Sequence, residues 1–132
     1  MEQQDSYFNN FYIIKDKVYY DCFLELRNRG FHQAEIEISA RSQIDYQNGL
    51  ISSPELATIG TIPENVEFAS EDDFSERVFP SISSKSLLQP INTVTIAGCT
   101  TKTYRFIFAG VYGKNPQKAD RLLPTVVIKG IN

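Results

Sequence analysis

Alternation of apolar and polar side chains between residues 18 and 27 is the feature that most constrains the fold. The apolar face comprises Val18, Tyr20, Cys22, Leu24 and Leu26. The other face carries Asp21, Glu25 and Arg27, with Phe23 among them. Because successive side chains of an extended chain point to opposite sides, this period of two predicts a strand buried on one face.

Turn residues between alternating segments predict two hairpins. The alternation returns at residues 34–41, after the stretch Asn28–Gly30, in which Gly reaches positive φ at little cost. We therefore expect segments 18–27 and 34–41 to pair as antiparallel neighbours. A second hairpin is expected around Asn48-Gly49, a dipeptide that suits a type I′ turn. Its strands are residues 44–47 and 50–52.

The remaining chain predicts further short strands around an irregular middle. Between residues 53 and 89, prolines, glycines and serines interrupt the pattern, and Ser70 followed by three acids indicates the N-cap of a short helix. Strands are expected at 92–96, 103–112 and 125–131, with a loop at 113–120. The nearly all-apolar segment 103–112 is expected to run centrally, covered on both sides. Short strands joined by turns indicate an all-β fold. We predict one antiparallel immunoglobulin-like β-sandwich domain over residues 1–132, with one short helix in its central segment.

Two stretches carry a family resemblance. Leu24-x-Leu26-x-Asn28-x-Gly30, followed by Ala34-x-Ile36-x-Ile38, resembles the strand, turn and strand that open immunoglobulin-like modules. The later stretch, Val94-x-Ile96-Ala97-Gly98-x-Thr100 leading to Tyr104-x-Phe106-x-Phe108, is similar to their second half. CARDB-type adhesion modules of bacterial surface proteins are the nearest comparison, over about half of the chain. The resemblance implies a sandwich that serves as an adhesive module at a surface.

Charge and hydropathy narrow the class of partner. The chain has 13 basic and 16 acidic side chains, a formal net charge of −3, and no basic run. Because nucleic-acid binding requires several phosphates to be neutralised, we expect no nucleic-acid partner, and anionic membranes are disfavoured for the same reason. No apolar run approaches the roughly 20 residues of a membrane span. Residues 1–5 lack a signal-peptide pattern. We expect no membrane insertion. A cytoplasmic setting, a virion-borne setting and an exported domain lacking its signal all stay open.

Residues that could carry catalysis are few. His32 is the single histidine, and Glu35 and Glu37 follow it closely, but no motif places a nucleophile beside them. A turn residue is therefore the simpler interpretation of His32. Zinc-binding spacings and glycine-rich phosphate loops are absent from the sequence. We expect a non-enzyme without a cofactor.

An acidic cluster and two cysteines leave alternatives open. The cluster comprises Glu71, Asp72, Asp73 and Glu76. Calcium prefers several oxygen ligands on a flexible loop, but this cluster lacks the spacing of a calcium loop. A solvated helix start explains the same residues. Cys22 and Cys99 form either a disulfide or two free thiols.

The aromatic residues favour a binding function. The aromatic side chains either fill the core or leave an outward set that forms an apolar patch for a partner, with Tyr19 and Phe23 or Arg105 and Ile107 as its candidate members. Phe23 is the sharpest anomaly, as an apolar residue on an otherwise charged face. We predict a non-catalytic protein–protein interaction or structural module, either a surface adhesive domain or a subunit of a larger assembly, whose partner is another protein or a second copy of the chain. The alternative function is a carbohydrate- or small-ligand-binding module assisted by calcium.

Overall fold

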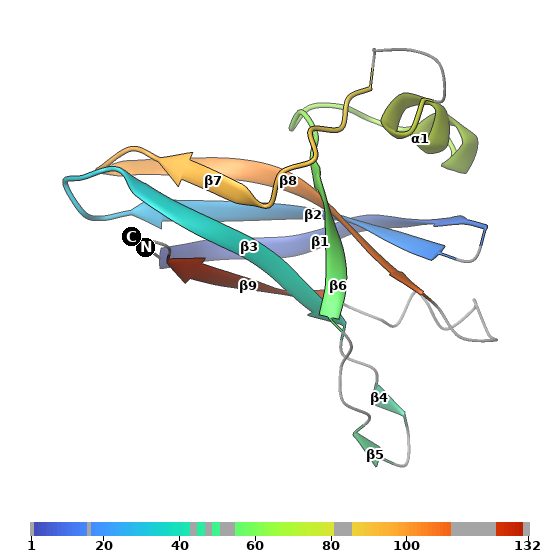
Figure 1. Cartoon of the computed structure of the whole chain (residues 1–132), viewed down its shortest axis with the longest axis horizontal. Helices are drawn as coiled ribbons and strands as arrows, with labels where there is room; N and C mark the ends of the chain where they lie inside the picture. Colours follow the sequence, from blue (N-terminus) through green and yellow to red (C-terminus); the bar gives the residue numbers. More distant parts are fainter. Residues whose placement is uncertain are drawn as a thin grey trace.

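The structure is a computed structural model that describes residues 2–15, 17–42, 45–46, 49–50, 55–80, 86–111 and 124–130. Its elements are, in chain order, β1 (Glu2–Ile14), β2 (Lys17–Asn28), β3 (Ala34–Ser42), β4 (Asp45–Tyr46), β5 (Gly49–Leu50), β6 (Glu55–Thr61), α1 (Glu71–Val78), β7 (Thr93–Ile96), β8 (Thr100–Val111) and β9 (Pro124–Gly130). Every ladder among the described residues is antiparallel. The predicted all-β fold with one short helix is confirmed (Figure 1).

The main sheet curls into two layers. Strands β1, β2, β8 and β6 form one layer in that order, and β6 also pairs with the end of β3. Strand β3 carries β7 on one edge and β9 on the other, because Ile36 pairs with both Val94 and Gly130. The part of the sheet built on β3 lies against β2 and β8 (Figure 1), which gives a sandwich-like fold.

The core between the layers is formed by the alternating residues that the sequence indicated. In the first layer, the apolar face of β2 lies beside Phe106 and Phe108 of the neighbouring strand β8. Strand β3 faces both of them across the core. Strand β3 contributes Ile36, Ile38 and Ala40. Burying each large apolar side chain stabilises the fold by about 1.5–3 kcal/mol. Strand β8 lies between β2 and β6, and residues 105–109 are buried, so the central position predicted for this segment is confirmed.

A second apolar cluster lies on the outer face of the first layer. Residues 62–79, which we call the cap, run across this face and include α1. Phe74 and Val78 of the helix pack with Ile62 of the cap and with Tyr12 and Ile107 of the sheet. The helix begins as predicted, because the Ser70 hydroxyl accepts a hydrogen bond from the Asp73 N–H at 3.1 Å.

The predicted pairing of residues 18–27 with 34–41 is wrong. Both segments are strands, but β2 pairs with β1 and β8, whereas β3 pairs with β6, β7 and β9. Residues 29–33 cross from one layer to the other and form an arch instead of a hairpin turn. The apolar faces of β2 and β3 therefore meet across the core, which produces the same alternation as a ladder would.

Other local predictions have mixed outcomes. The second hairpin forms, but Gly49 pairs with Tyr46 and so belongs to a strand and not to the predicted turn, while Asn48 lies outside the described residues. Strands β1 and β6 were not predicted. Tyr112, the expected loop 113–120 and Ile131 lie outside the described residues. Both cysteines are free thiols, Cys22 buried and Cys99 exposed. Burial raises the pKa of the Cys22 thiol.

Candidate functional site

A buried ion pair lies under the cap. The Asp21 carboxylate on β2 accepts hydrogen bonds from Arg105 on β8, at 2.7 Å from Nε and 2.5 Å from Nη2. Asp21 is 0% exposed and Arg105 is 3% exposed. The side-chain amide of Asn9 also donates to Asp21, at 3.3 Å. Two parallel charge-assisted bonds of this kind are strong and fix both side chains in one geometry.

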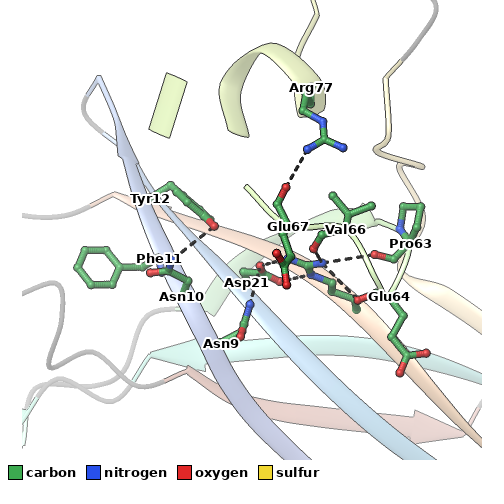
Figure 2. A network of polar contacts seen from close by, with 11 residues as sticks. Asn9, Asn10, Phe11, Tyr12, Asp21, Pro63, Glu64, Val66, Glu67 and Arg77 are labelled. Atoms are coloured by element: carbon green, nitrogen blue, oxygen red, sulfur yellow. Dashed lines mark hydrogen bonds and ion pairs between the residues drawn. The ribbon is translucent and has the colours of Figure 1, made fainter. Parts of the chain in front are cut away.

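The same arginine attaches the cap to the sheet. Its Nη1 donates to the backbone carbonyl of Val66, and the carbonyls of Pro63 and Glu64 lie 3.5 and 3.4 Å away. Figure 2 shows these three carbonyls converging beside Asp21. The cap residues 63–66 form no strand pairing with the sheet, so Arg105 supplies a donor to their carbonyl groups, of which that of Pro63 also accepts from the Val66 N–H at 3.5 Å.

Aromatic rings extend this ion pair into a stack of side chains. The Arg105 guanidinium lies 5.1 Å from the ring centre of Phe23 and 5.5 Å from that of Phe68. On the far side of Phe23, the Tyr7 ring stacks at 5.1 Å with an interplanar angle of 10°. Within the cap, Arg77 lies 5.4 Å from the centre of the Phe68 ring. These residues form what we call the arginine–aromatic stack, which comprises Tyr7, Phe23, Arg105, Phe68 and Arg77. Cation–π contacts of this kind stabilise each arginine.

The predicted binding patch is on one face of the sheet, but it is not exposed. Tyr19, Phe23, Arg105 and Ile107 all point to the outer face of the first layer. The cap covers that face: Arg105 and Ile107 are buried, and Tyr19 packs against Phe74 and Phe79. Arg105 and Ile107 therefore do not contribute to an open apolar patch, whereas Tyr19 and Phe23 are half-buried, Phe23 between Tyr7 and Arg105.

A sequence signal for the buried pair was available. An arginine within a strand predicted to be covered on both sides requires a buried acid, since an unpaired charge is too costly there. Asp21, flanked by apolar neighbours on a half-buried strand, was the matching residue. The sequence did not reveal that a loop some 40 residues from Arg105 would supply the remaining acceptors.

The acidic cluster serves the helix and β1. Asp73 accepts a hydrogen bond from Ala69 N–H at 2.9 Å and lies 3.6 Å from Arg77. Glu71 accepts from the Ile13 N–H of β1 at 3.2 Å. Negative charge in the first helical turn also complements the helix dipole. No group of three or more His, Cys, Asp or Glu side chains that could hold a metal is found in the described part of the chain.

The arch between β2 and β3 presents the most exposed large apolar side chain of the described chain. Phe31 is 89% exposed. We call residues 29–32, together with the adjoining turn 97–99, the arch tip. His32, the residue considered for catalysis, is exposed beside Phe31, in agreement with its interpretation as a turn residue.

A buried asparagine fixes the backbone of the arch tip. Asn28 Nδ2 donates to the carbonyls of His32 at 2.8 Å and of Ile96 and Ala97 at 3.2 Å each. Its Oδ1 accepts from the Gly30 N–H at 3.0 Å. Because one side chain bonds both halves of the tip, the exposed Phe31 is held on an ordered backbone.

The two halves of the arch tip also touch directly. Cys99 N–H donates to the Gly30 carbonyl at 2.8 Å. A Cβ on Gly98 would lie 2.3 Å from the Phe31 carbonyl oxygen, so only glycine fits at this position. The arch tip therefore combines close backbone contact with a protruding aromatic side chain.

Comparison of the chain with protein-family models, with curated proteins and with solved structures found no match. Within the described residues, no helix has both the length and the apolar character needed to cross a membrane.

Proposed function

We propose that this chain is a non-catalytic interaction module that docks a protein partner through its arch tip. The observation that carries the proposal is the 89% exposure of Phe31 on a backbone fixed by Asn28. An exposed phenylalanine gains free energy when a partner buries it, at about 25 cal/mol per Å² of apolar surface. A fixed backbone lowers the entropy that is lost on binding.

Charge around the arch tip favours an acidic partner surface. Arg27, Arg29 and Lys102 are exposed at the end of the sandwich that carries the tip, and nearby acids include Glu35, which is exposed, and Glu2, which lies opposite Arg27 in the β1–β2 register. The whole chain is acidic, with a formal net charge of −3. A locally basic rim around an aromatic anchor steers an acidic partner toward that end and gives specificity. The resemblance to adhesion modules is in keeping with this role.

The proposal is tested with a photo-crosslinking amino acid placed at position 31 and, separately, at position 127 on the outer face of β9. Extracts of the source cells are irradiated, and the crosslinked proteins are identified. We expect position 31 to capture a partner that unlabelled wild-type chain displaces and that Phe31→Ser does not. Equal displacement by the wild-type and Phe31→Ser chains would contradict the proposal, as would equal capture at both positions.

A second candidate function rests on Tyr7. This tyrosine is 53% exposed, and one face of its ring stacks on Phe23. A ring held in this way offers its other face to a sugar, as in a carbohydrate-binding module. Neutral oligosaccharides distinguish the candidates: a binding signal lost in Tyr7→Ser and kept in Phe31→Ser would favour the carbohydrate module over the protein-docking module.

A further inference from the structure

Among the strands that the structure describes, two of the three at the edges of the sheet are protected against pairing with another chain. Strand β1 has register shifts between Gln3 and Asp5 and between Phe8 and Asn10. Side chains also occupy backbone N–H groups of β1, since Asn10 Oδ1 accepts from Phe11 at 2.8 Å and Glu71 accepts from Ile13. Bulges and side-chain covers are the usual means of blocking an edge strand.

Strand β7 is protected by its shortness. It comprises four residues, Thr93–Ile96. The hydroxyl of Tyr104 also donates to the Thr95 carbonyl at 3.2 Å. A strand of this length with an occupied carbonyl is a poor template for further pairing.

Strand β9 differs from both. It pairs with β3 over its whole length, from Pro124 to Gly130, without a register shift. Strand β1 approaches from the facing layer, but in the described part of the chain the ladder of β9 is with β3 alone. Its sequence, Thr-Val-Val-Ile, is rich in the β-branched residues that favour strands.

The hydrogen bonds of β3 show which groups of β9 face outward. The Ile38 N–H donates to the Asn92 carbonyl on the β7 side, and the Ile38 carbonyl accepts from Thr58 on the β6 side. By alternation, the backbone groups of residues 37, 39 and 41 point to β9, where their partners are residues 129, 127 and 125. The N–H and C=O groups of Val126 and Ile128 therefore point away from β3, to the open edge.

We propose that β9 pairs with β9 of a second copy of this chain, which joins two sheets antiparallel about a twofold axis at Val127. In this register Val126 of each copy exchanges both hydrogen bonds with Ile128 of the other. It is the symmetric register that overlaps all of β9. The surface differs from the arch tip, so the dimer goes beyond the proposed docking function and does not depend on it.

The register is self-complementary in side chains as well as in backbone. Val127 points to the outside and is 42% exposed, so the twofold axis places two exposed valines against each other. Lys129 comes opposite Thr125 of the other copy, so no like charges face each other across the pair. A closed pair of this kind leaves no copy of β9 free to recruit a third chain.

Solution mass by light scattering tests the dimer, over a hundredfold concentration range that reaches about 1 mM because small interfaces bind weakly. We expect the wild-type mass to rise toward twice that of the monomer. Val127→Lys places two lysines opposite each other at the axis and should leave a monomer throughout. Val127→Thr, the matched control, keeps a small β-branched residue. The concentration at which it dimerises should lie within about tenfold of the concentration at which the wild type dimerises.

A second pair of variants tests the backbone bonds. Ile128→Pro removes one outward N–H, while Ile128→Ala makes a similar loss of side chain and keeps that N–H. Dimers in Ile128→Ala that are absent in a folded Ile128→Pro support the pairing. A wild-type monomer at every concentration would overturn the proposal. So would a dimer that survives Val127→Lys, or one that Phe31→Ser dissolves, because it would lie on another surface.

Discussion

Replacing Asp21 by valine leaves the Arg105 guanidinium buried without its counter-ion. Replacing Arg105 by methionine likewise leaves the Asp21 carboxylate buried without its counter-ion. Each single change thus isolates one charge that is almost wholly removed from water, at 0% and 3% exposure. The double variant, Asp21→Val with Arg105→Met, removes both charges together. These three variants form a double-mutant cycle around the ion pair at the centre of the arginine–aromatic stack.

The magnitude follows from burial and geometry. Breaking a buried pair by removing one partner costs about 3–5 kcal/mol, whereas an apolar replacement of both partners is often close to neutral. For a chain of this size, about 3–4 °C of melting temperature corresponds to 1 kcal/mol, so each single change should lower the melting temperature by about 10–20 °C. The double variant should be more stable than the sum of the single changes predicts, by about 2 kcal/mol or more.

Urea unfolding followed by circular dichroism measures the cycle, and hydrogen exchange reports on the cap. The double variant still lacks the donor for the carbonyls of Pro63, Glu64 and Val66, so exchange in residues 62–68 should quicken while β3 is unaffected. Two results would refute the reasoning: single changes that each cost less than about 1 kcal/mol, or a double variant whose loss equals the sum of the single losses.

Two further predictions concern the arch tip and high pH. Gly98→Ala should lower the unfolding free energy by about 1–3 kcal/mol, because its Cβ would lie 2.3 Å from the Phe31 carbonyl oxygen. Gly130→Ala, the control, places its Cβ in open space and should change the unfolding free energy little. Equal melting temperatures for the two variants would contradict this prediction. Burial raises the pKa of Tyr20 to about 12, so the native state retains a proton that the unfolded chain, with an ordinary tyrosine pKa near 10, releases. The urea midpoint should therefore fall as pH rises from about 10 toward 12, less steeply in Tyr20→Phe, and a midpoint that is constant over this range would count against it.

Strands whose pattern is local were predictable from the sequence. The alternation at 18–27 and 34–41 reports burial of one face whichever strand lies opposite, and Ser70 begins α1 through a contact three residues away. The pairing of those strands was not predictable, because Asn28 bonds carbonyls at residues 96 and 97 that no local pattern connects to it. An Asn-x-Gly stretch suits a hairpin turn and an arch equally well.

The missed strands share a physical cause. The register shifts in β1 between Gln3 and Asp5 and between Phe8 and Asn10 move successive residues to the other face, which erases a period of two. In β6 a similar shift surrounds Gly60, whose φ of 153° and contact with the Gln89 backbone exclude other residues. Exposure around Phe23 depends on the cap, so the sequence left open whether these side chains are buried or form a patch, and Phe31 at the arch tip was not singled out.

The affinity of Phe31→Ser for the partner captured at position 31 tests the proposed docking function most directly. Buried aromatic anchors often contribute 2 kcal/mol or more to an interface, and 1.4 kcal/mol corresponds to a factor of ten. Because Phe31 is 89% exposed, we expect the variant to melt within about 1 °C of the wild type and to bind at least about tenfold more weakly. An unchanged affinity at an unchanged melting temperature would show that the arch tip is not the docking surface.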